Sequence, residues 1–176
     1  MRRIEGAYSL VIMTEHELIG VRDPHGFRPL SIGKLGDGWV LSSETCALDL
    51  IHAKFVRDVE PGEIVIIDSK GLRSIKYMPE HERRAFCIFE YVYFARPDSL
   101  VFGQSVYLVR KRLGAALARE HPLAGDLVMP FPDSGVYAAL GYTAATGIPF
   151  EMGVIRNHYV GRTFIQPTQS MRDFSV

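Results

Sequence analysis

The sequence predicts an α+β region followed by an α/β region. Three observations carry this prediction: short β-type runs between turns over residues 1–78, apolar residues at helical spacing over 105–120, and a strand–loop–helix–strand order over 126–155. The segment between the two regions, residues 77–84, is polar and charged and contains one proline. We therefore expect two domains, residues 1–84 and residues 85–176.

The first region is expected to be an antiparallel sheet with one helix packed against it. Its apolar runs alternate with turns that contain Gly, Asp and Pro, which is typical of antiparallel strands. A helix is expected to begin after Ser42 or Ser43, because either hydroxyl could cap its first turn. The expected strands are residues 6–13, 17–21, 39–41, 55–59, 64–67 and 72–75, and the expected apolar side of the helix carries Cys46, Ala47, Leu48 and Ile51.

The second region is expected to begin with an amphipathic helix over residues 105–120, where apolar residues recur every three or four positions. A strand over 126–129, a loop over 130–135, a helix over 136–146 and a strand over 149–155 would then form a parallel unit. The apolar positions of the first helix are Val106, Val109, Leu113 and Leu117, and its polar positions are Arg110, Lys111, Arg112, Arg119 and Glu120.

Composition excludes several classes of function. The chain has 176 residues, of which 47% are hydrophobic and 23% charged, enough to bury a core. Twenty basic and twenty acidic residues give a net charge of zero, so binding to nucleic acid or to an anionic membrane is not expected. Two cysteines are too few for a disulfide framework, so a reducing, cytoplasmic compartment is expected. The apolar runs are strand-sized, whereas a membrane span needs about 20 apolar residues, so neither a span nor a signal peptide is expected.

One motif is the charged segment Arg22–Leu30, with the sequence RDPHGFRPL, between two expected strands. Its residues are ordinary turn formers, and from periodicity alone it is a loop in which Arg28 pairs with a carboxylate. With Gly6–Leu10 before it and Ser42–Thr45 after it, however, the order resembles the second half of the class II glutamine amidotransferase domain, an N-terminal nucleophile hydrolase.

A second and a third motif narrow this resemblance. Cys87–Ser99, with the sequence CIFEYVYFARPDS, would by itself be a buried aromatic strand that ends in an Arg-Pro-Asp turn. It resembles the junction between the glutaminase and phosphoribosyltransferase domains of the amidophosphoribosyltransferase family. Asn157–Pro167, with the sequence NHYVGRTFIQP, resembles a second hallmark of that family. The resemblance extends from about Glu5 to Phe174 and covers well under half of a complete member, so an internal fragment is expected.

The resemblance implies a fold and a reaction. The fold would be the second half of an αββα sandwich joined to the first part of a type I phosphoribosyltransferase parallel sheet. The complete enzyme, a glycosyltransferase, would take ammonia from glutamine and displace pyrophosphate from phosphoribosyl pyrophosphate. The product is 5-phosphoribosylamine, the entry compound of purine synthesis. Magnesium as a cofactor, feedback inhibition by purine nucleotides and a homotetramer are implied as well.

The resemblance also implies roles for particular residues. A loop that closes over phosphoribosyl pyrophosphate would contain the cation Arg162, where an arginine can bind phosphate with two hydrogen bonds. Ser134 would contribute an oxygen near magnesium, beside Asp133, in a loop at a helix N-terminus that attracts anions. Cys87 stands where some members hold an iron–sulfur cluster, which needs four thiolates. The other implied residues are Tyr159, Gly161 and Thr163 for the substrate and Tyr91, Tyr93 and Arg96 for the interdomain junction.

No catalytic residue is assigned to this chain. In the family, glutamine is hydrolysed by a cysteine at the mature N-terminus, whose own amino group is the base. The chain starts Met1-Arg2-Arg3, and its first cysteine is Cys46, so by itself it is expected to be inactive. Two alternatives stay open: a non-catalytic regulatory or scaffold protein of the same family, or part of another class II glutamine amidotransferase. The segment Tyr159–Pro167 argues against the latter.

Overall fold

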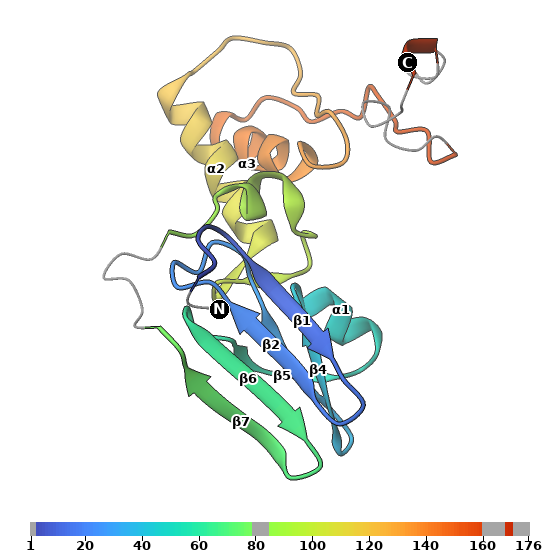
Figure 1. Cartoon of the computed structure of the whole chain (residues 1–176). Coiled ribbons are helices and arrows are strands. Elements are labelled where there is room, and N and C mark those ends of the chain that lie inside the picture. The colour runs from blue at the N-terminus through green and yellow to red at the C-terminus, as the bar shows by residue number, and fades with distance from the viewer. Residues whose placement is uncertain (1–2, 79–84, 160–167, 171–176) are drawn as a thin grey trace. The chain divides into compact units, whose positions relative to one another are not determined.

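The computed structural model of the chain describes residues 3–78, 85–159 and 168–170. The chain forms two compact units, Met1–Arg110 and Lys111–Val176, which divide inside helix α2 (Val106–Glu120). Figure 1 shows the course of the chain through its helices and strands. The predicted domain boundary between residues 84 and 85 lies inside the first unit. It stays a prediction, because a compact unit and a domain need not end at the same residue.

Besides a short two-stranded hairpin, the described part of the first unit contains two larger antiparallel sheets, where the strand pattern predicted one and the resemblance implied part of an αββα sandwich. One sheet has the strand order β1-β2-β6-β7 and the other β4-β3-β5. The strands are β1 (Ser9–Met13), β2 (Leu18–Arg22), β3 (Ser31–Leu35), β4 (Gly38–Ser42), β5 (Lys54–Asp58), β6 (Glu63–Asp68) and β7 (Gly71–Lys76). All strands except β3 coincide with predicted runs. β3 escaped prediction because it lacks alternation: Ser31, Ile32 and Gly33 are all buried, and it is hydrogen-bonded on both sides.

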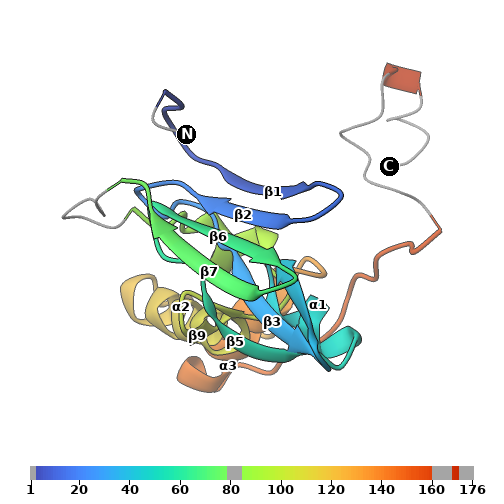
Figure 2. The same cartoon turned by 60° about the horizontal axis from the view of Figure 1, so that its bottom comes forward.

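The two sheets share one apolar core. Figure 2 shows β2, β6 and β7 lying over β3 and β5. The fully buried residues between them are aliphatic, and partly buried aromatic and aliphatic side chains pack around these. Burying such side chains contributes about 1.5–3 kcal/mol each. The core consists of Leu30, Ile32, Val59 and Val65, with Trp39, Leu41 and Leu72 packed against it.

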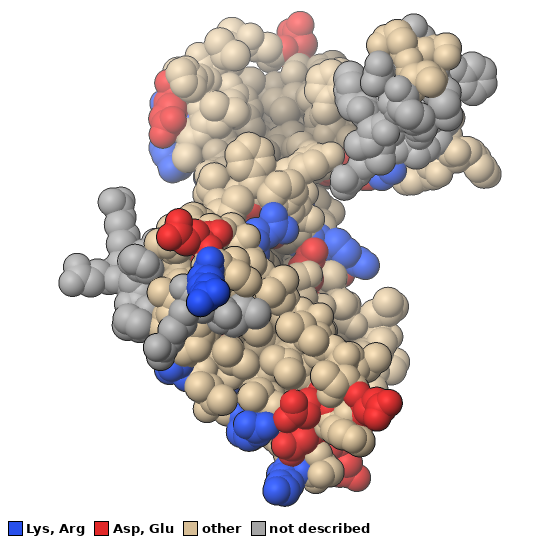
Figure 3. Space-filling view, in the orientation of Figure 1, with Lys and Arg blue, Asp and Glu red and all other residues tan. Residues whose placement is uncertain are grey.

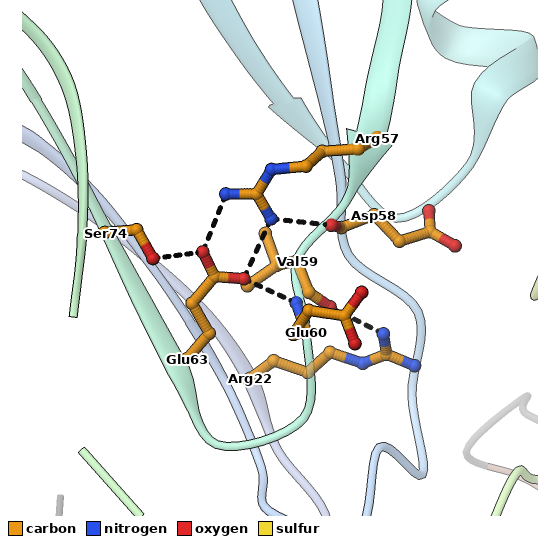
Figure 4. A network of polar contacts seen from close by, with 7 residues as sticks. All are labelled: Arg22, Arg57, Asp58, Val59, Glu60, Glu63 and Ser74. Carbon is orange, nitrogen blue, oxygen red and sulfur yellow. Dashed lines mark hydrogen bonds and ion pairs between the residues drawn. The ribbon is translucent and has the colours of Figure 1, made fainter. Parts of the chain in front are cut away.

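A polar network also joins the two sheets (Figure 4). The Arg57 guanidinium in β5 donates two hydrogen bonds to the Glu63 carboxylate in β6, at 2.7 and 2.9 Å. The Ser74 hydroxyl in β7 and the Glu60 N–H donate to the same carboxylate. Burial by itself would raise the pKa of Glu63, but the donors outweigh burial and hold that pKa below its usual value. The network therefore keeps a buried carboxylate charged.

The predicted helix after the fourth strand is α1 (Thr45–Leu50), and its cap differs from the prediction. The residue before the helix is Glu44, without a side-chain capping bond, whereas the Ser42 hydroxyl accepts a hydrogen bond from the Glu44 N–H at 3.3 Å. The prediction of Ser42 or Ser43 as the cap was wrong by one or two residues. The buried residues of α1 are Thr45, Cys46 and Leu48. They differ from the predicted ones because a helix of six residues buries little more than one turn.

The predicted aromatic strand within Cys87–Ser99 is wrong. The segment forms a π-helical turn, η1 (Glu90–Phe94), closed by a hydrogen bond from the Ala95 N–H to the Glu90 carbonyl at 3.0 Å. Aromatic and β-branched residues favoured a strand, but tertiary packing decided otherwise. The turn brings Tyr91 and Ala95 into one buried cluster with Val101 and Val106, beside the short hairpin β8 (Leu100–Val101) and β9 (Gln104–Ser105).

Both predicted helices of the second region are present, as α2 and as α3 (Val136–Thr146). They approach closely: a Cβ on Gly114 would clash with the Ala138 carbonyl, and one on Gly141 with the Lys111 carbonyl. The predicted strands over 126–129 and 149–155 reduce to one parallel bridge between Val128 and Phe150. None of the helices in the described residues has the length and apolar character needed to cross a membrane.

The buried stripe of α2 also differs from the prediction. Leu113 and Leu117 are 42% and 49% exposed, whereas Val106, Arg110, Gly114 and Ala118 are buried at intervals of four. Small residues and an arginine occupy the inward positions because α3 approaches closely and because backbone carbonyls face Arg110.

Candidate functional site

Three of the segments singled out from the sequence meet in the first unit. They are the loop Arg22–Leu30, the segment Ser42–Thr45 at the start of α1, and the segment Cys87–Ser99, which contains η1, together with its flanking residues over 85–101. We call this meeting point the junction site.

The loop Arg22–Leu30 is held rigidly by two buried charged residues. The Asp23 carboxylate accepts hydrogen bonds from the N–H groups of His25 at 2.9 Å and Phe27 at 3.2 Å. The Arg22 guanidinium donates to three carbonyls, those of Gly26, Arg28 and Val59, at 3.1, 2.9 and 2.6 Å. The predicted turn is confirmed, and its carbonyl groups are satisfied from within the core.

Two main-chain hydrogen bonds attach the segment after residue 84 to this loop. The Ala85 N–H donates to the His25 carbonyl at 3.0 Å, and the Cys87 N–H donates to the Phe27 carbonyl at 3.1 Å. Between them, the Phe86 ring stacks on Phe102 with centroids 4.2 Å apart. The main-chain hydrogen bonds thus join the segment to the loop, and the ring stack packs the segment against Phe102 in the turn between β8 and β9.

An ion pair forms the next contact between the loop and η1. Arg28 Nε lies 2.7 Å from Glu90 Oε1, and the Glu90 side chain is 2% exposed, against 43% for Arg28. The Arg28 guanidinium also lies over the Phe94 ring, 4.7 Å from its centroid. Burial raises the pKa of Glu90, Arg28 opposes this rise, and the nearby Glu44 carboxylate adds to it. The carboxylate expected opposite Arg28 is thus Glu90, a residue that the sequence did not single out.

Glu44 fixes the Arg-Pro-Asp turn that follows η1. Its Oε2 accepts hydrogen bonds from the Arg96 N–H at 2.7 Å and from the Ser99 hydroxyl at 2.9 Å. The next residue, Thr45, accepts a hydrogen bond from the Leu100 N–H at 2.8 Å. The segment Ser42–Thr45 was singled out from the sequence, but its pattern did not indicate what the Glu44 carboxylate contacts, because a carboxylate before a short helix usually faces the solvent.

Arg110 of α2 holds the other side of η1. Its guanidinium donates to the Tyr91 carbonyl and, at 2.8 Å, to the Ala95 carbonyl. Arg110 is only 4% exposed, although the sequence placed it among the polar positions of the helix. An inward arginine on a helix is detectable only once the carbonyl groups that it contacts are known.

The three predicted interdomain residues lie on or next to η1, with different exposure. Tyr91 is buried and donates its hydroxyl to the Val101 carbonyl at 2.8 Å. Tyr93 is 51% exposed, and its ring meets Phe94 edge-on at 6.1 Å. The Arg96 side chain is exposed and pairs with Asp98 at 2.8 Å. Tyr91 thus packs inside the junction site, whereas Arg96 contacts it chiefly through its main chain.

Three of the four predicted substrate residues, Arg162, Gly161 and Thr163, lie outside the described residues. Tyr159 is fully exposed, and its N–H donates to the Asn157 side chain at 3.0 Å. The structure therefore describes one of these four residues, in an exposed position.

The predicted magnesium ligand Ser134 lies in a loop that offers few other ligands. Ser134 is half-buried in the turn before α3, and the neighbouring Asp133 carboxylate lies 3.2 Å from Arg156. Within the described ranges, no three His, Cys, Asp or Glu side chains gather as a metal site would require. One hydroxyl and a carboxylate already paired with arginine do not make a magnesium site without further ligands.

The predicted iron–sulfur ligand Cys87 also lacks the further ligands that its site would need. Cys87 is half-buried and unbridged, and Cys46 is the only other thiol in the sequence. A cluster needs four thiolates, so these residues do not fit one by themselves. Burial raises the pKa of the Cys46 thiol, which keeps it protonated.

Charged side chains on the face shown in Figure 3 gather in small groups of both signs. This distribution agrees with the balanced composition. It provides no one-signed surface on that face for nucleic acid or anionic lipid.

Comparisons with known proteins show that this chain is similar to amidophosphoribosyltransferases. No family model matches the chain. The chain is 55% identical over 174 residues to the chloroplastic amidophosphoribosyltransferase of Glycine max, covering 98% of this chain and 30% of that protein. It is 50% identical over 173 residues to the amidophosphoribosyltransferase of Bacillus subtilis, covering 98% of this chain and 36% of that protein.

A solved structure extends the similarity to the fold. It is that of the glutamine phosphoribosylpyrophosphate amidotransferase from Bacillus subtilis in complex with ADP and GMP. The TM-score is 0.86 at 50% identity, over 98% of this chain and 38% of that one. The chain thus spans about a third of the length of the curated relatives that it matches. Over that third of their length, the chain is homologous to the amidophosphoribosyltransferases.

Proposed function

We propose that this chain forms the junction between the glutamine-hydrolysing and phosphoribosyl-transferring parts of an amidophosphoribosyltransferase. One observation carries the proposal: residues on either side of the predicted boundary at 84 and 85 are joined inside a single compact unit. Two main-chain hydrogen bonds, the Arg28–Glu90 ion pair and the Glu44 contacts make this connection. A connection with so many partners is suited to reporting the state of one site to another.

In the proposed reaction, ammonia from glutamine displaces pyrophosphate from the anomeric carbon of phosphoribosyl pyrophosphate and yields 5-phosphoribosylamine. Magnesium, when bound, would neutralise charge on the leaving pyrophosphate. The residues of this chain would contribute by holding the two parts in register, so that ammonia passes between them without protonation by water. A homotetramer in the cytoplasm stays a prediction, as does feedback by purine nucleotides. The Bacillus subtilis relative was solved with ADP and GMP.

Within this proposal, Arg162 binds a phosphate of the substrate, and Tyr159, Gly161 and Thr163 line the same loop. An arginine suits this role because its planar guanidinium can donate two hydrogen bonds to one phosphate. Ser134 would meet a hydrated magnesium ion that the substrate phosphates also bind. A cluster at Cys87 would need three further thiolates from outside this sequence.

A chimera tests the proposed function. Residues 1–176 replace the matching region of the Bacillus subtilis amidophosphoribosyltransferase, and formation of 5-phosphoribosylamine is measured with glutamine and, separately, with ammonia. Activity with both nitrogen sources supports the proposal. A folded chimera that uses neither contradicts it and favours the non-catalytic scaffold alternative.

Arg96 is tested in the same chimera. We expect Arg96→Ala to weaken the dependence of glutamine hydrolysis on phosphoribosyl pyrophosphate, because this side chain and Asp98 order the turn that Glu44 binds. Arg73→Ala is the matched control, since Arg73 also forms exposed ion pairs, with Glu17 at 2.8 Å and with Asp68. Equal dependence in the two variants would remove Arg96 from the junction.

A further inference from the structure

We propose that Arg28 and Glu90 are positioning residues, whose contact transmits the state of the loop Arg22–Leu30 to α2. The inference that this contact couples two sites rests on the proposed function, whereas the contact between Arg28 and Glu90 is seen in the structure.

The geometry of the pair distinguishes it from a structural ion pair. Arg28 and Glu90 approach to 2.7 Å, yet Glu90 Oε1 is buried without a well-aligned hydrogen-bond donor in the described part of the chain. Charge and proximity thus hold the contact, with little directional bonding. Arg28 is 43% exposed, so its guanidinium has open space to move away from the carboxylate. Opening the contact leaves the Glu90 carboxylate buried without its cation, so the position of Arg28 and the charge of Glu90 depend on each other.

The Phe94 ring gives Arg28 a second contact on the same turn. Arg28 lies over that ring at 4.7 Å from the centroid, while its Nε faces Glu90. The wider π-helical turn brings both side chains to one guanidinium, and such turns frequently occur at functional sites. A change in the position of Arg28 therefore acts on both ends of η1.

A continuous series of contacts leads away from the pair in both directions. On the loop side, the Arg28 carbonyl accepts a hydrogen bond from the buried Arg22 at 2.9 Å. On the helix side, the Tyr91 and Ala95 carbonyls accept hydrogen bonds from Arg110, which lies in α2. α2 begins in the first unit at Val106 and continues through Glu120. The series provides a physical route, and measured coupling has to test it.

The first experiment measures the contact in the full 176-residue chain by hydrogen exchange. In Glu90→Gln, we expect the Ala85 and Cys87 amides to exchange faster, because these N–H groups bond to the loop that Arg28 no longer holds. The melting temperature and exchange in β2 and β6 should not change. Unchanged exchange at both amides overturns the proposal, whatever the chimera does.

The second experiment measures coupling in the chimera, as the ratio of glutamine hydrolysis rates with and without phosphoribosyl pyrophosphate. We expect Glu90→Gln to lower this ratio about tenfold, within the usual range of coupling between sites. Synthesis from ammonia should not change. Arg28→Lys, which keeps the charge but loses the flat guanidinium, should retain part of the ratio. Glu17→Gln, at an exposed Arg–Glu pair, is the matched control.

The outcomes separate this proposal from the proposed function. A lower ratio of hydrolysis rates at an unchanged melting temperature supports the role of Arg28 and Glu90 as positioning residues. An unchanged ratio overturns it, and so does a ratio that falls only together with the melting temperature. A folded chimera without synthesis contradicts the proposed function instead, and the exchange of Ala85 and Cys87 then decides the contact separately.

Discussion

Two buried glutamates in the first unit, Glu63 and Glu90, each pair with an arginine, but their surroundings differ. Glu63 accepts hydrogen bonds from Arg57, Ser74 and the Glu60 N–H. Glu90 faces Arg28 and lies near the like charge of Glu44. The pKa of Glu63 is accordingly lowered, and the pKa of Glu90 is raised by burial. Comparable burial thus has opposite consequences, because the number of donors decides whether the charge is stabilised.

The largest expected loss of stability comes from breaking the Arg57–Glu63 pair. Glu63→Gln removes the charge that Arg57 binds with two hydrogen bonds, and we expect a loss of about 3 kcal/mol in the free energy of unfolding. Urea unfolding of the chain measures it. Ser74→Ala, which removes one donor, should cost only about 1 kcal/mol. A loss under about 1 kcal/mol for Glu63→Gln would mean that the network is weaker than its geometry indicates.

The next effect concerns the cation of the second pair. Arg28→Met leaves the Glu90 carboxylate buried without its cation, and we expect a loss of about 1–2 kcal/mol at neutral pH. The loss should shrink on acidification, because a protonated Glu90 needs no cation. Unfolding measured at neutral and at acid pH tests this, and a loss independent of pH would contradict the comparison.

Neutralising the second carboxylate should have a smaller effect still. Glu90→Gln removes both the attraction to Arg28 and the burial cost of the charge, so the free energy of unfolding should stay within about 1 kcal/mol of its original value. The same measurement on Glu63→Gln supplies the contrast. Equal losses in the two variants would abolish the distinction between the pairs.

The pH dependence of stability is the finest test. Because the pKa of Glu63 is lowered in the folded chain, its stabilising contribution is present above the ordinary value of 4.5 and is lost as the pH falls through the folded pKa. The pKa of Glu90 is raised, so its contribution is present below 4.5 and is lost as the pH rises through the folded pKa. A plot of the free energy of unfolding against pH should therefore be flatter than that of the original chain below pH 4.5 in Glu63→Gln. In Glu90→Gln it should be flatter above pH 4.5. Parallel curves would contradict the assigned directions.

Local sequence by itself determined most strands and both long helices of this protein. β2, β6 and β7 combine β-branched residues with Gly and Asp turns, and α3 is an alanine-rich run between Gly135 and Gly147. The motif in Arg22–Leu30 also indicated its turn and the pairing of Arg28. These features depend on neighbours within a few residues, which is why they are visible in a sequence.

Only the tertiary structure decided how the strands divide between the two larger sheets, the π-helical turn and the partners of the buried charges. The strand expected at Cys87–Ser99 became η1 because the burial of Tyr91 and Ala95 and the carbonyl contacts of Arg110 outweighed strand propensity. Glu44 contacts Arg96 and Ser99 more than fifty positions away, and Glu90 contacts Arg28 across a similar separation. Such contacts depend on how the chain folds back on itself, and no local pattern encodes which carboxylate a given arginine will meet.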